Sequence, residues 1–249
     1  MYTIHNPVIS DTFLKNSILW ITVFFLITSF ILFSPWASAT TLSNEERNAL
    51  FQQNGLFTGS YDIPDVLITD TRDILFRDIS VNWAEADIQR LVIRGIIDNV
   101  AYFHPHESLS RAEFLKIIIN TAGWIKPTLV LNVAFNDVSS ESWYSPYVSV
   151  GISRGLLENT TLFRPNDPIT RAEASMMLMK SLWISLYEPM SMPYSDVNMN
   201  SDFAKYIEWV TYLNIFSGQL KNGNRIFRPY DSISRSEIAK VVVNTFSLE

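Results

Sequence analysis

One stretch of this chain occurs three times, and it decides the fold. Residues 103–119 have the sequence FHPHESLSRAEFLKIII. Residues 163–179 have the sequence FRPNDPITRAEASMMLM, and residues 227–243 have the sequence FRPYDSISRSEIAKVVV. Each copy holds Phe-x-Pro, then Ser or Thr followed three residues later by Glu, and then an apolar run. A unit repeated within one chain indicates a shared architecture for its copies.

The Ser/Thr-x-x-Glu pattern predicts a helix start in every copy. The residue pairs are Ser110 with Glu113, Thr170 with Glu173 and Ser234 with Glu237. In such a capping box the hydroxyl and the carboxylate accept hydrogen bonds from backbone N–H groups that a helix start leaves unpaired. We therefore expect a helix to follow each Ser or Thr and to contain the apolar run.

A second helix is expected ahead of each of these, so that the unit is helix-loop-helix. In the first copy the apolar residues of 83–92 fall mainly on one face of a helix that Gly95 can end. Gly155 and Asn214 occupy the same place in the other copies. Because one helical pair cannot bury its apolar side alone, we predict a single all-α domain of pseudo-threefold character.

The repeats set the predicted boundaries along the chain, which are residues 76–123, 135–183 and 194–246. The joints between them contain Pro and hydrophobic residues instead of a Ser/Gly linker composition, so we expect them to be packed. Residues 40–75 lie outside the repeat and are predicted to be a short leader with one helix.

The N-terminal segment is typical of export. An uncharged apolar run at residues 17–33 follows Lys15 and is closed by Pro35 and Ala37-Ser-Ala39. This pattern predicts a signal peptide over residues 1–39 that is cleaved after Ala39. The alternative is an uncleaved anchor, since a run of about 18 apolar residues can span a bilayer. In either case residues 40–249 lie outside the cytoplasm, and the membrane is contacted only through residues 17–33.

Composition narrows the classes of function. The 249 residues are 47% apolar and 18% charged, which is a globular composition. A net charge of −6 leaves no general basic surface, so no nucleic-acid partner is expected. Since the chain has no Cys, disulfides, iron–sulfur clusters and a Cys nucleophile are excluded.

The ordered set of motifs resembles the S-layer homology (SLH) domain. Phe-x-Asp, Trp, Gly-Ile-Ile, Phe-x-Pro and Ser/Thr-Arg-Ala-Glu follow one another in this order, three times in succession between Phe76 and Phe246. The third copy departs from the pattern, with Tyr194 for Phe, Phe203 for Trp, Asn214 for Gly and Ser236 for Ala. The resemblance implies a pseudo-threefold helical assembly of three SLH repeats at the cell surface. It also implies non-covalent binding of cell-wall polysaccharide, such as a pyruvylated secondary wall polymer, or of peptidoglycan-linked glycan.

The resemblance further implies a site in the grooves between repeats, where the arginine of the Thr-Arg-Ala-Glu motif contacts an acidic sugar. The matching residues are Arg111, Arg171 and Arg235. Electrostatics points to the same residues. A cation at the first helical position is unfavourable, because it faces the positive end of the helix dipole, so its recurrence in three copies calls for an explanation. A carboxylate or phosphate ligand would offset that cost and suits a guanidinium fork.

A purely structural role for these arginines is the alternative. Each could pair with a nearby aspartate and join the repeats, the candidates being Asp78, Asp137 and Asp196. On the ligand hypothesis we expect each arginine to be exposed, and a triple Arg→Ala variant to stay folded.

Aromatic residues and loops complete the candidate site. Trp83 and Trp143 could stack on sugar rings, although an aromatic residue at a repeated helix start is more often part of the core. The Phe-x-Pro residues are expected to anchor the loop structurally. The first two loops lack the glycines usual in the family, whereas the third retains Gly218 and Gly223. The number of working grooves, from none to three, stays open.

No catalytic or metal-binding pattern is found, so we predict no enzyme activity, no cofactor and no metal. The series Asp196-x-Asn-x-Asn-x-Asp202 lacks the Gly and Glu of a calcium loop. His104 and His106 lack a third distant His within the exported part. A glycan hydrolase would need paired carboxylates in a groove. The remaining alternative is a structural protein of the surface layer that acts through contacts with other surface-layer proteins.

Overall fold

The computed structural model describes residues 74–128, 135–158, 160–183, 186–189 and 191–246. The chain divides into two compact parts, residues 1–40 and 41–249, and every described residue lies in the second. The predicted signal or anchor (residues 1–39), residues 40–73 of the predicted leader and residues 129–134 of the first joint lie outside the described residues. Within the described ranges, no helix combines the length and apolarity needed to cross a membrane.

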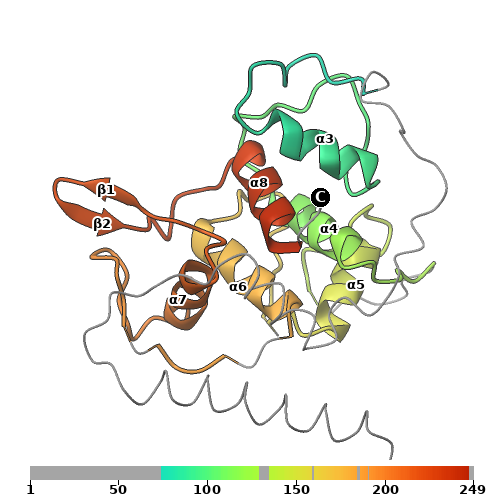
Figure 1. Cartoon of the computed structure of the whole chain (residues 1–249). Helices are drawn as coiled ribbons and strands as arrows, with labels where there is room; N and C mark the ends of the chain where they lie inside the picture. Colours follow the sequence, from blue (N-terminus) through green and yellow to red (C-terminus); the bar gives the residue numbers. More distant parts are fainter. Residues whose placement is uncertain (1–73, 129–134, 159, 184–185, 190, 247–249) are drawn as a thin grey trace, which may run out of the picture. The chain divides into compact units, whose positions relative to one another are not determined.

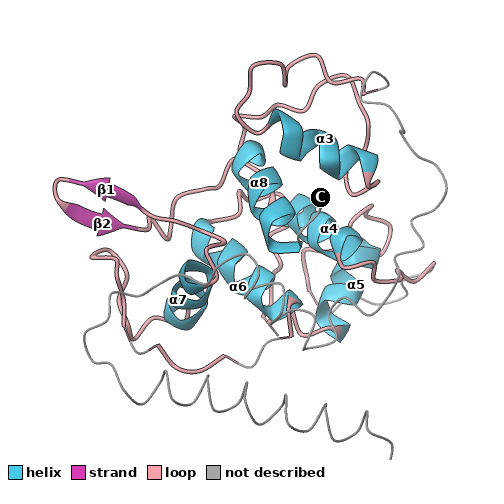
Figure 2. Ribbon diagram, viewed as in Figure 1, coloured by secondary structure: helices cyan, strands magenta, loops and turns pink. Residues whose placement is uncertain are grey.

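The described residues form six helices and one small antiparallel sheet, as Figures 1 and 2 show. The helices are α3 (Glu85–Ile93), α4 (Arg111–Thr121), α5 (Ser145–Ser153), α6 (Arg171–Ser181), α7 (Ala204–Tyr212) and α8 (Arg235–Phe246). The strands are β1 (Gln219–Lys221) and β2 (Asn224–Ile226). The predominantly helical class predicted from the sequence is therefore confirmed.

Helices α4, α6 and α8 begin where the Ser/Thr-x-x-Glu pattern predicts. The Ser110 hydroxyl accepts from the Glu113 N–H at 3.3 Å, and the Glu113 carboxylate accepts from the Ser110 N–H at 2.9 Å. The same reciprocal bonds join Thr170 to Glu173 and Ser234 to Glu237. Because each box satisfies N–H groups that a helix leaves unpaired, it fixes the first residue of each helix.

The shorter helices α3, α5 and α7 end at residues in the left-handed region, as predicted. Gly95 has φ +61°, Gly155 has φ +68° and Asn214 has φ +56°. In the first case the turn is closed by the Ile96 N–H, which donates to the Leu91 carbonyl at 2.9 Å. Glycine and, at some cost, asparagine adopt this conformation, which explains why the third copy tolerates Asn.

The helices pack across the sequence repeat instead of within it. We call α3 and α4 unit 1, α5 and α6 unit 2, and α7 and α8 unit 3. Helix α5 packs against α4, α7 packs against α6, and α3 packs against α8 (Figure 1). Each short helix thus lies on a long helix of another unit. Since the last of these contacts joins the first and last described helices, the helical pairs do not fold separately.

The segments ahead of the three long helices are joined in a closed ring of backbone hydrogen bonds. The Leu109 N–H donates to the Ile233 carbonyl at 3.1 Å, and the Ile233 N–H donates to the Ile169 carbonyl at 3.2 Å. The Ile169 N–H donates back to the Leu109 carbonyl at 2.9 Å. All three side chains are buried, so every unit contributes one buried residue to the ring.

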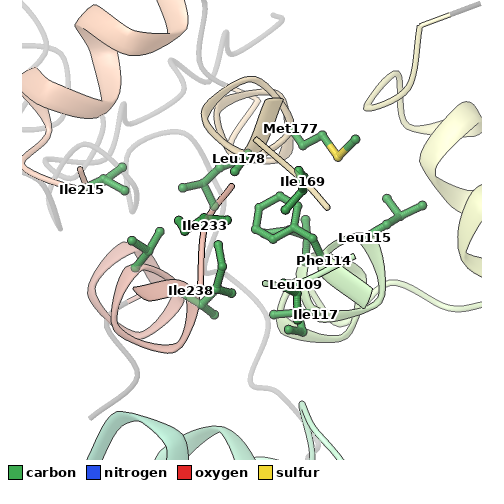
Figure 3. Close-up of a cluster of buried hydrophobic side chains, with 14 of the residues drawn as sticks. Leu109, Phe114, Leu115, Ile117, Ile169, Met177, Leu178, Ile215, Ile233 and Ile238 are labelled. Atoms are coloured by element: carbon green, nitrogen blue, oxygen red, sulfur yellow. The ribbon is translucent and has the colours of Figure 1, made fainter. Parts of the chain in front are cut away.

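Apolar side chains from all three units surround this ring (Figure 3). Phe114 of α4 lies beside Ile169, while Leu178 of α6 and Ile238 of α8 approach from the other units. Phe114 and Leu178 have no exposed surface. The core is therefore shared among the units, and removing one unit would expose the apolar surface of the others.

The aspartate of each Phe/Tyr-x-Asp motif holds the Phe-x-Pro loop of its own unit. The Asp78 carboxylate accepts from the N–H groups of Phe103 and His104, both at 2.8 Å. Asp137 does the same for Phe163 and Arg164, and Asp196 for Phe227 and Arg228. The residue after Phe adopts a left-handed backbone every time, with φ between 58° and 59°. The two bonds to one carboxylate help to offset the strain of that conformation.

A β-hairpin in unit 3 departs from the all-α prediction. Strands β1 and β2 pair in antiparallel register, with Leu220 opposite Arg225. Asn222 and Gly223 connect them with φ of 51° and 81°. Two successive residues with positive φ suit the two-residue turn of a hairpin, for which Asn-Gly is the favoured sequence. The loop is longer in unit 3 than in the other units, and this extra length forms the hairpin.

Candidate functional site

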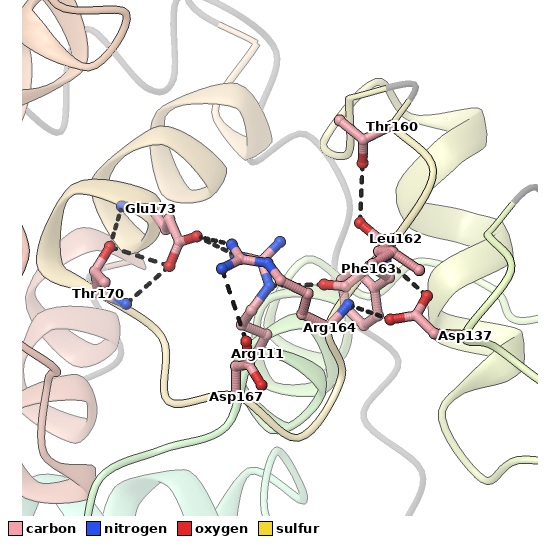
Figure 4. A network of polar contacts seen from close by, with 9 residues as sticks. All are labelled: Arg111, Asp137, Thr160, Leu162, Phe163, Arg164, Asp167, Thr170 and Glu173. Carbon is pink, nitrogen blue, oxygen red and sulfur yellow. Dashed lines mark hydrogen bonds and ion pairs between the residues drawn. The ribbon is translucent and has the colours of Figure 1, made fainter.

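The three motif arginines each reach from one unit into the next. Arg111 Nε donates to the Phe163 carbonyl at 2.8 Å, and its Nη1 lies 2.7 Å from Glu173 Oε1 (Figure 4). The contacts of the other two have the same form. Arg171 contacts the Phe227 carbonyl at 2.8 Å and Glu237 at 3.5 Å, and Arg235 contacts the Phe103 carbonyl and Glu113, both at 2.7 Å. The carboxylate is always the capping-box glutamate of the neighbouring unit.

These contacts correct the expectation that the arginines are exposed. The exposed fraction of the side chain is 10% for Arg111 and 5% for Arg171, and it reaches 22% for Arg235. Each guanidinium also lies over the Phe-x-Pro phenyl ring of the neighbouring unit, 4.8–5.4 Å from its centroid. Burial lowers the pKa of both Arg111 and Arg171, and the charge of the paired glutamate partly offsets this shift.

The proposed pairing of the arginines with Asp78, Asp137 and Asp196 is wrong. Those carboxylates accept from backbone N–H groups of their own units, as described above. The expectation that the arginines connect the repeats holds, but with the capping-box glutamates as partners. A glutamate that caps one helix and pairs with an arginine of another unit performs both tasks with different oxygen atoms: Glu113 Oε2 caps and Oε1 pairs.

The glutamates make stability sensitive to acid. Burial alone would raise the pKa of Glu113 and Glu173, but hydrogen bonds from the cap residue and the paired arginine bring each pKa below its usual value. Backbone hydrogen bonds from Phe103 and His104 likewise outweigh burial and lower the pKa of Asp78. A carboxylate whose pKa is lower in the folded state contributes stability above its unfolded pKa and loses it as pH falls through the folded value.

We therefore expect the free energy of unfolding to be nearly constant from pH 7 to about 5, and to fall as pH drops below about 4.5, where unfolded carboxyl groups begin to bind protons. Urea unfolding at pH 7, 5, 4 and 3 measures this dependence. In Glu173→Gln the stability at pH 7 should be lower and its decline in acid shallower. Stability that rises between pH 5 and pH 3 contradicts these assignments.

Trp83 and Trp143 are exposed, which is contrary to a core role. Their exposed fractions are 59% and 55%. A lysine of the neighbouring unit lies near each ring, with Lys240 Nζ 5.5 Å from the centroid of Trp83 and Lys116 Nζ 6.0 Å from that of Trp143. Phe203, the equivalent residue of unit 3, is half-buried. Two of the three equivalent positions thus offer an aromatic face with a cation beside it.

A cavity of about 410 Å³ lies beside the Arg111–Glu173 pair. Its polar wall includes Arg111, Arg164 and Glu173, and its apolar wall includes Leu157, Met176 and Phe203. Arg164 forms a second ion pair with Glu173 (Figure 4), so two cations share one carboxylate there. This part of the molecule combines guanidinium groups with an apolar wall. In the described ranges, no group of three or more His, Asp or Glu side chains could hold a metal ion.

Three cations near these contacts, Lys116, Lys240 and Arg164, are not among the residues predicted from the sequence. The two lysines each stand five residues after a motif arginine, and Arg164 is the middle residue of a Phe-x-Pro motif. Their places in the repeat are a signal that could have identified them, but their neighbours belong to other units. Only the packing of α4 on α5 and of α8 on α3 brings the lysines to the tryptophans.

Comparison with known proteins finds the S-layer homology domain and several relatives. The family model matches residues 134–175 and 193–239. The chain is 28% identical over 179 residues to an exoglucanase XynX of Acetivibrio thermocellus, and 29% identical over 175 residues to a surface-layer 125 kDa protein of Lysinibacillus sphaericus. An amylopullulanase of Thermoanaerobacterium thermosulfurigenes is 28% identical over 178 residues.

Each of these matches covers 68–69% of this chain, yet the chain spans only 16%, 14% and 9% of the three relatives in the order given. The similarity is therefore to one part of much longer proteins. The two family matches lie on units 2 and 3 and include both of their Arg-x-Glu motifs. Residues 134–175 and 193–239 of this chain are accordingly similar to the S-layer homology domain.

Proposed function

We propose that this chain is a non-catalytic anchoring module that binds acidic cell-wall polysaccharide non-covalently at the cell surface. It does so as three SLH repeats, residues 76–123, 135–183 and 194–246, packed in pseudo-threefold fashion. The equivalent contacts of Arg111, Arg171 and Arg235 support three repeats, as does the hydrogen-bonded ring through Leu109, Ile169 and Ile233. The export pattern of residues 1–39 is consistent with a surface location.

The observation that carries the proposal is the pairing of an exposed tryptophan with a lysine at two junctions between units. An indole face suits the apolar face of a pyranose ring, and an ammonium group suits a carboxylate on the same sugar. In this account one of these pairs, Trp83 with Lys240 or Trp143 with Lys116, forms the stacking platform. Arg111, Arg171 and Arg235 shape the junctions.

The relatives support a binding role over a catalytic one. A similar stretch occurs in proteins named as an exoglucanase, an amylopullulanase and a surface-layer protein. A segment shared by proteins of such different names fits a module that attaches them to a common support. We therefore propose no catalytic role for this chain and no cofactor.

A Trp83→Ala, Trp143→Ala double variant should bind wall sacculi from the source organism about fivefold or more weakly, since one stacking contact contributes about 1 kcal/mol. Co-sedimentation with the full chain measures this loss. Trp183→Ala is the matched control, because Trp183 is 57% exposed but lies after α6 and belongs to neither Trp–Lys pair. Equal retention of the double variant and the wild type contradicts the stacking role.

A structural role in a surface layer is the second candidate. The hairpin favours it, because Leu220 at its centre and the nearby Tyr230 are 74% and 73% exposed. Exposed apolar residues on a projecting hairpin suit contact with another surface-layer protein. Light scattering at high protein concentration tests this role, and a strict monomer without wall polymer would weaken it.

A further inference from the structure

The three junctions between units are not chemically equivalent. Five residues after the motif arginine, α4 and α8 carry Lys116 and Lys240, whereas α6 carries Met176. The aromatic residue supplied by the facing unit is Trp143 for α4, Trp83 for α8 and Phe203 for α6. Two junctions, α4–α5 and α8–α3, therefore both have a tryptophan and a lysine at equivalent positions. Any difference in binding between these two junctions must come from the residues around the pair.

The α4–α5 junction has its cation neutralised. Asp98, which follows α3, lies 2.6 Å from Lys116 Nζ, and Lys116 is only 23% exposed. Asp98 stands three residues after Gly95, the residue that ends α3. A carboxylate on the sugar would have to compete with Asp98 for the ammonium group, and it would be repelled by the Asp98 charge.

The α8–α3 junction has no such counter-ion. Ser217 stands three residues after Asn214, the place that Asp98 occupies in unit 1. The two turns have the same backbone bonds, from Ile96 and Ile97 to Leu91 and from Ile215 and Phe216 to Val210. Among the described residues no carboxylate forms an ion pair with Lys240, which is exposed.

The other charged side chains named at this junction already have an ion-pair or hydrogen-bond partner. Arg235 pairs with Glu113 at 2.7 Å. On α3, Asp87 pairs with Arg90, and the Glu85 carboxylate accepts from the Gln89 side-chain amide. Lys240 is thus the cation left available beside the face of Trp83, among the residues that the structure describes.

The α6–α7 junction lacks the Trp–Lys pair of the other two. Met176 and Phe203 give it an apolar surface, and both line the cavity described above. The nearby lysine, Lys180, is 3.2 Å from Glu158, the residue at the position of Asp98 in unit 2. Its charge is therefore balanced in the same way as that of Lys116.

We infer that the α8–α3 junction is the site that takes the acidic sugar, with Trp83 under the pyranose ring and Lys240 on its carboxylate. This inference rests on the proposed wall-binding function and adds which of the equivalent junctions performs it. Ser217 is the position that decides the choice, because a carboxylate there would neutralise Lys240. One junction per chain binds, where the repeat alone would suggest up to three.

Co-sedimentation with wall sacculi from the source organism tests the inference through matched lysine variants of the full chain. Lys240→Gln should weaken binding about fivefold or more, as expected for loss of one charge contact, while Lys116→Gln should leave binding within about twofold of the wild type. Circular dichroism checks that both variants are folded. Equal weakening by the two variants overturns the inference.

The second test moves the carboxylate from position 98 to position 217. Ser217→Asp should weaken binding about as much as Lys240→Gln, and adding Asp98→Ser should restore it by freeing Lys116 beside Trp143. Ser217 is exposed and its backbone carbonyl contacts Arg171, so the substitution leaves that bond in place. Undiminished binding of Ser217→Asp overturns the inference while wall binding itself stands. Failure of the wild type to bind sacculi removes the proposed function, and the inference falls with it.

Discussion

Arg171→Ala should destabilise the protein by about 3–4 kcal/mol, the range for breaking a buried charge pair and leaving its hydrogen-bond partners unsatisfied. The side chain is 5% exposed. Its guanidinium donates to the carbonyls of Phe227 and Ser217 and lies 3.5 Å from Glu237. Alanine would leave two carbonyl groups and one carboxylate without this partner. Urea unfolding at pH 7 measures the loss.

Arg77→Ala is the matched control, because Arg77 is exposed, and its stability should stay within about 0.5 kcal/mol of the wild type. Arg235→Ala should fall between the two, since Arg235 is more exposed than Arg171. An Arg171→Ala protein as stable as the wild type would show that the guanidinium contacts contribute little. The same argument reverses the expectation that a triple Arg→Ala variant stays folded, so tests of binding are better made at Trp83 and Lys240.

Phe114→Ala should cost about 3–5 kcal/mol, the usual range for removing a fully buried phenyl group. Phe114 belongs to α4, has no exposed surface and lies beside Ile169 of unit 2 (Figure 3). Because the core is shared, the variant should still unfold in a single transition, with all helical signal lost together. Thermal and urea unfolding followed by circular dichroism measure both properties.

Leu220→Ala serves as the control for the loss of apolar surface, because Leu220 is 74% exposed on the hairpin, and its effect should be within about 0.5 kcal/mol. Two separate transitions in the Phe114→Ala protein, with part of the helical signal retained after the first, would contradict a core shared by the three units.

Local features of the fold could be predicted from the sequence because their causes are local. The capping boxes at Ser110, Thr170 and Ser234 locate the starts of α4, α6 and α8, since each box acts within four residues. Gly95 and Gly155 likewise mark the ends of α3 and α5 through their own backbone preference. The hairpin is absent from the prediction although residues 222–223 carry its turn signal, because alignment with the other repeats makes the extra residues look like a longer loop.

The candidate site was less predictable because its contacts cross between units. Arg171 stands at the start of α6 but meets Glu237, 66 residues away. Nothing local distinguishes Glu237 from Asp196 as its partner. Trp83 and Trp143 precede helices that begin at Glu85 and Ser145, so the helical periodicity that suggested an inward face does not apply to them. How far these two tryptophans are exposed depends on how the units pack together, which the local sequence does not show.

The three aspartates and the three arginines have different structural roles in the repeat. Aspartates hold the Phe-x-Pro loops within each unit, and arginines fasten those loops to the long helix of another unit. With both sets engaged in structure, the variable residues around them set the chemistry of each junction. Ser217 in place of an acidic residue is one such difference, and Met176 in place of lysine is another.

The most direct test of wall anchoring is co-sedimentation of the full chain with sacculi from the source organism, before and after chemical removal of the polymers attached to peptidoglycan. We expect binding to intact sacculi that weakens as salt is raised, because ionic contacts are screened over about 8–10 Å near physiological ionic strength. We also expect binding to be lost on stripped sacculi. Salt-independent binding that persists after stripping would contradict an acidic secondary polymer as the ligand.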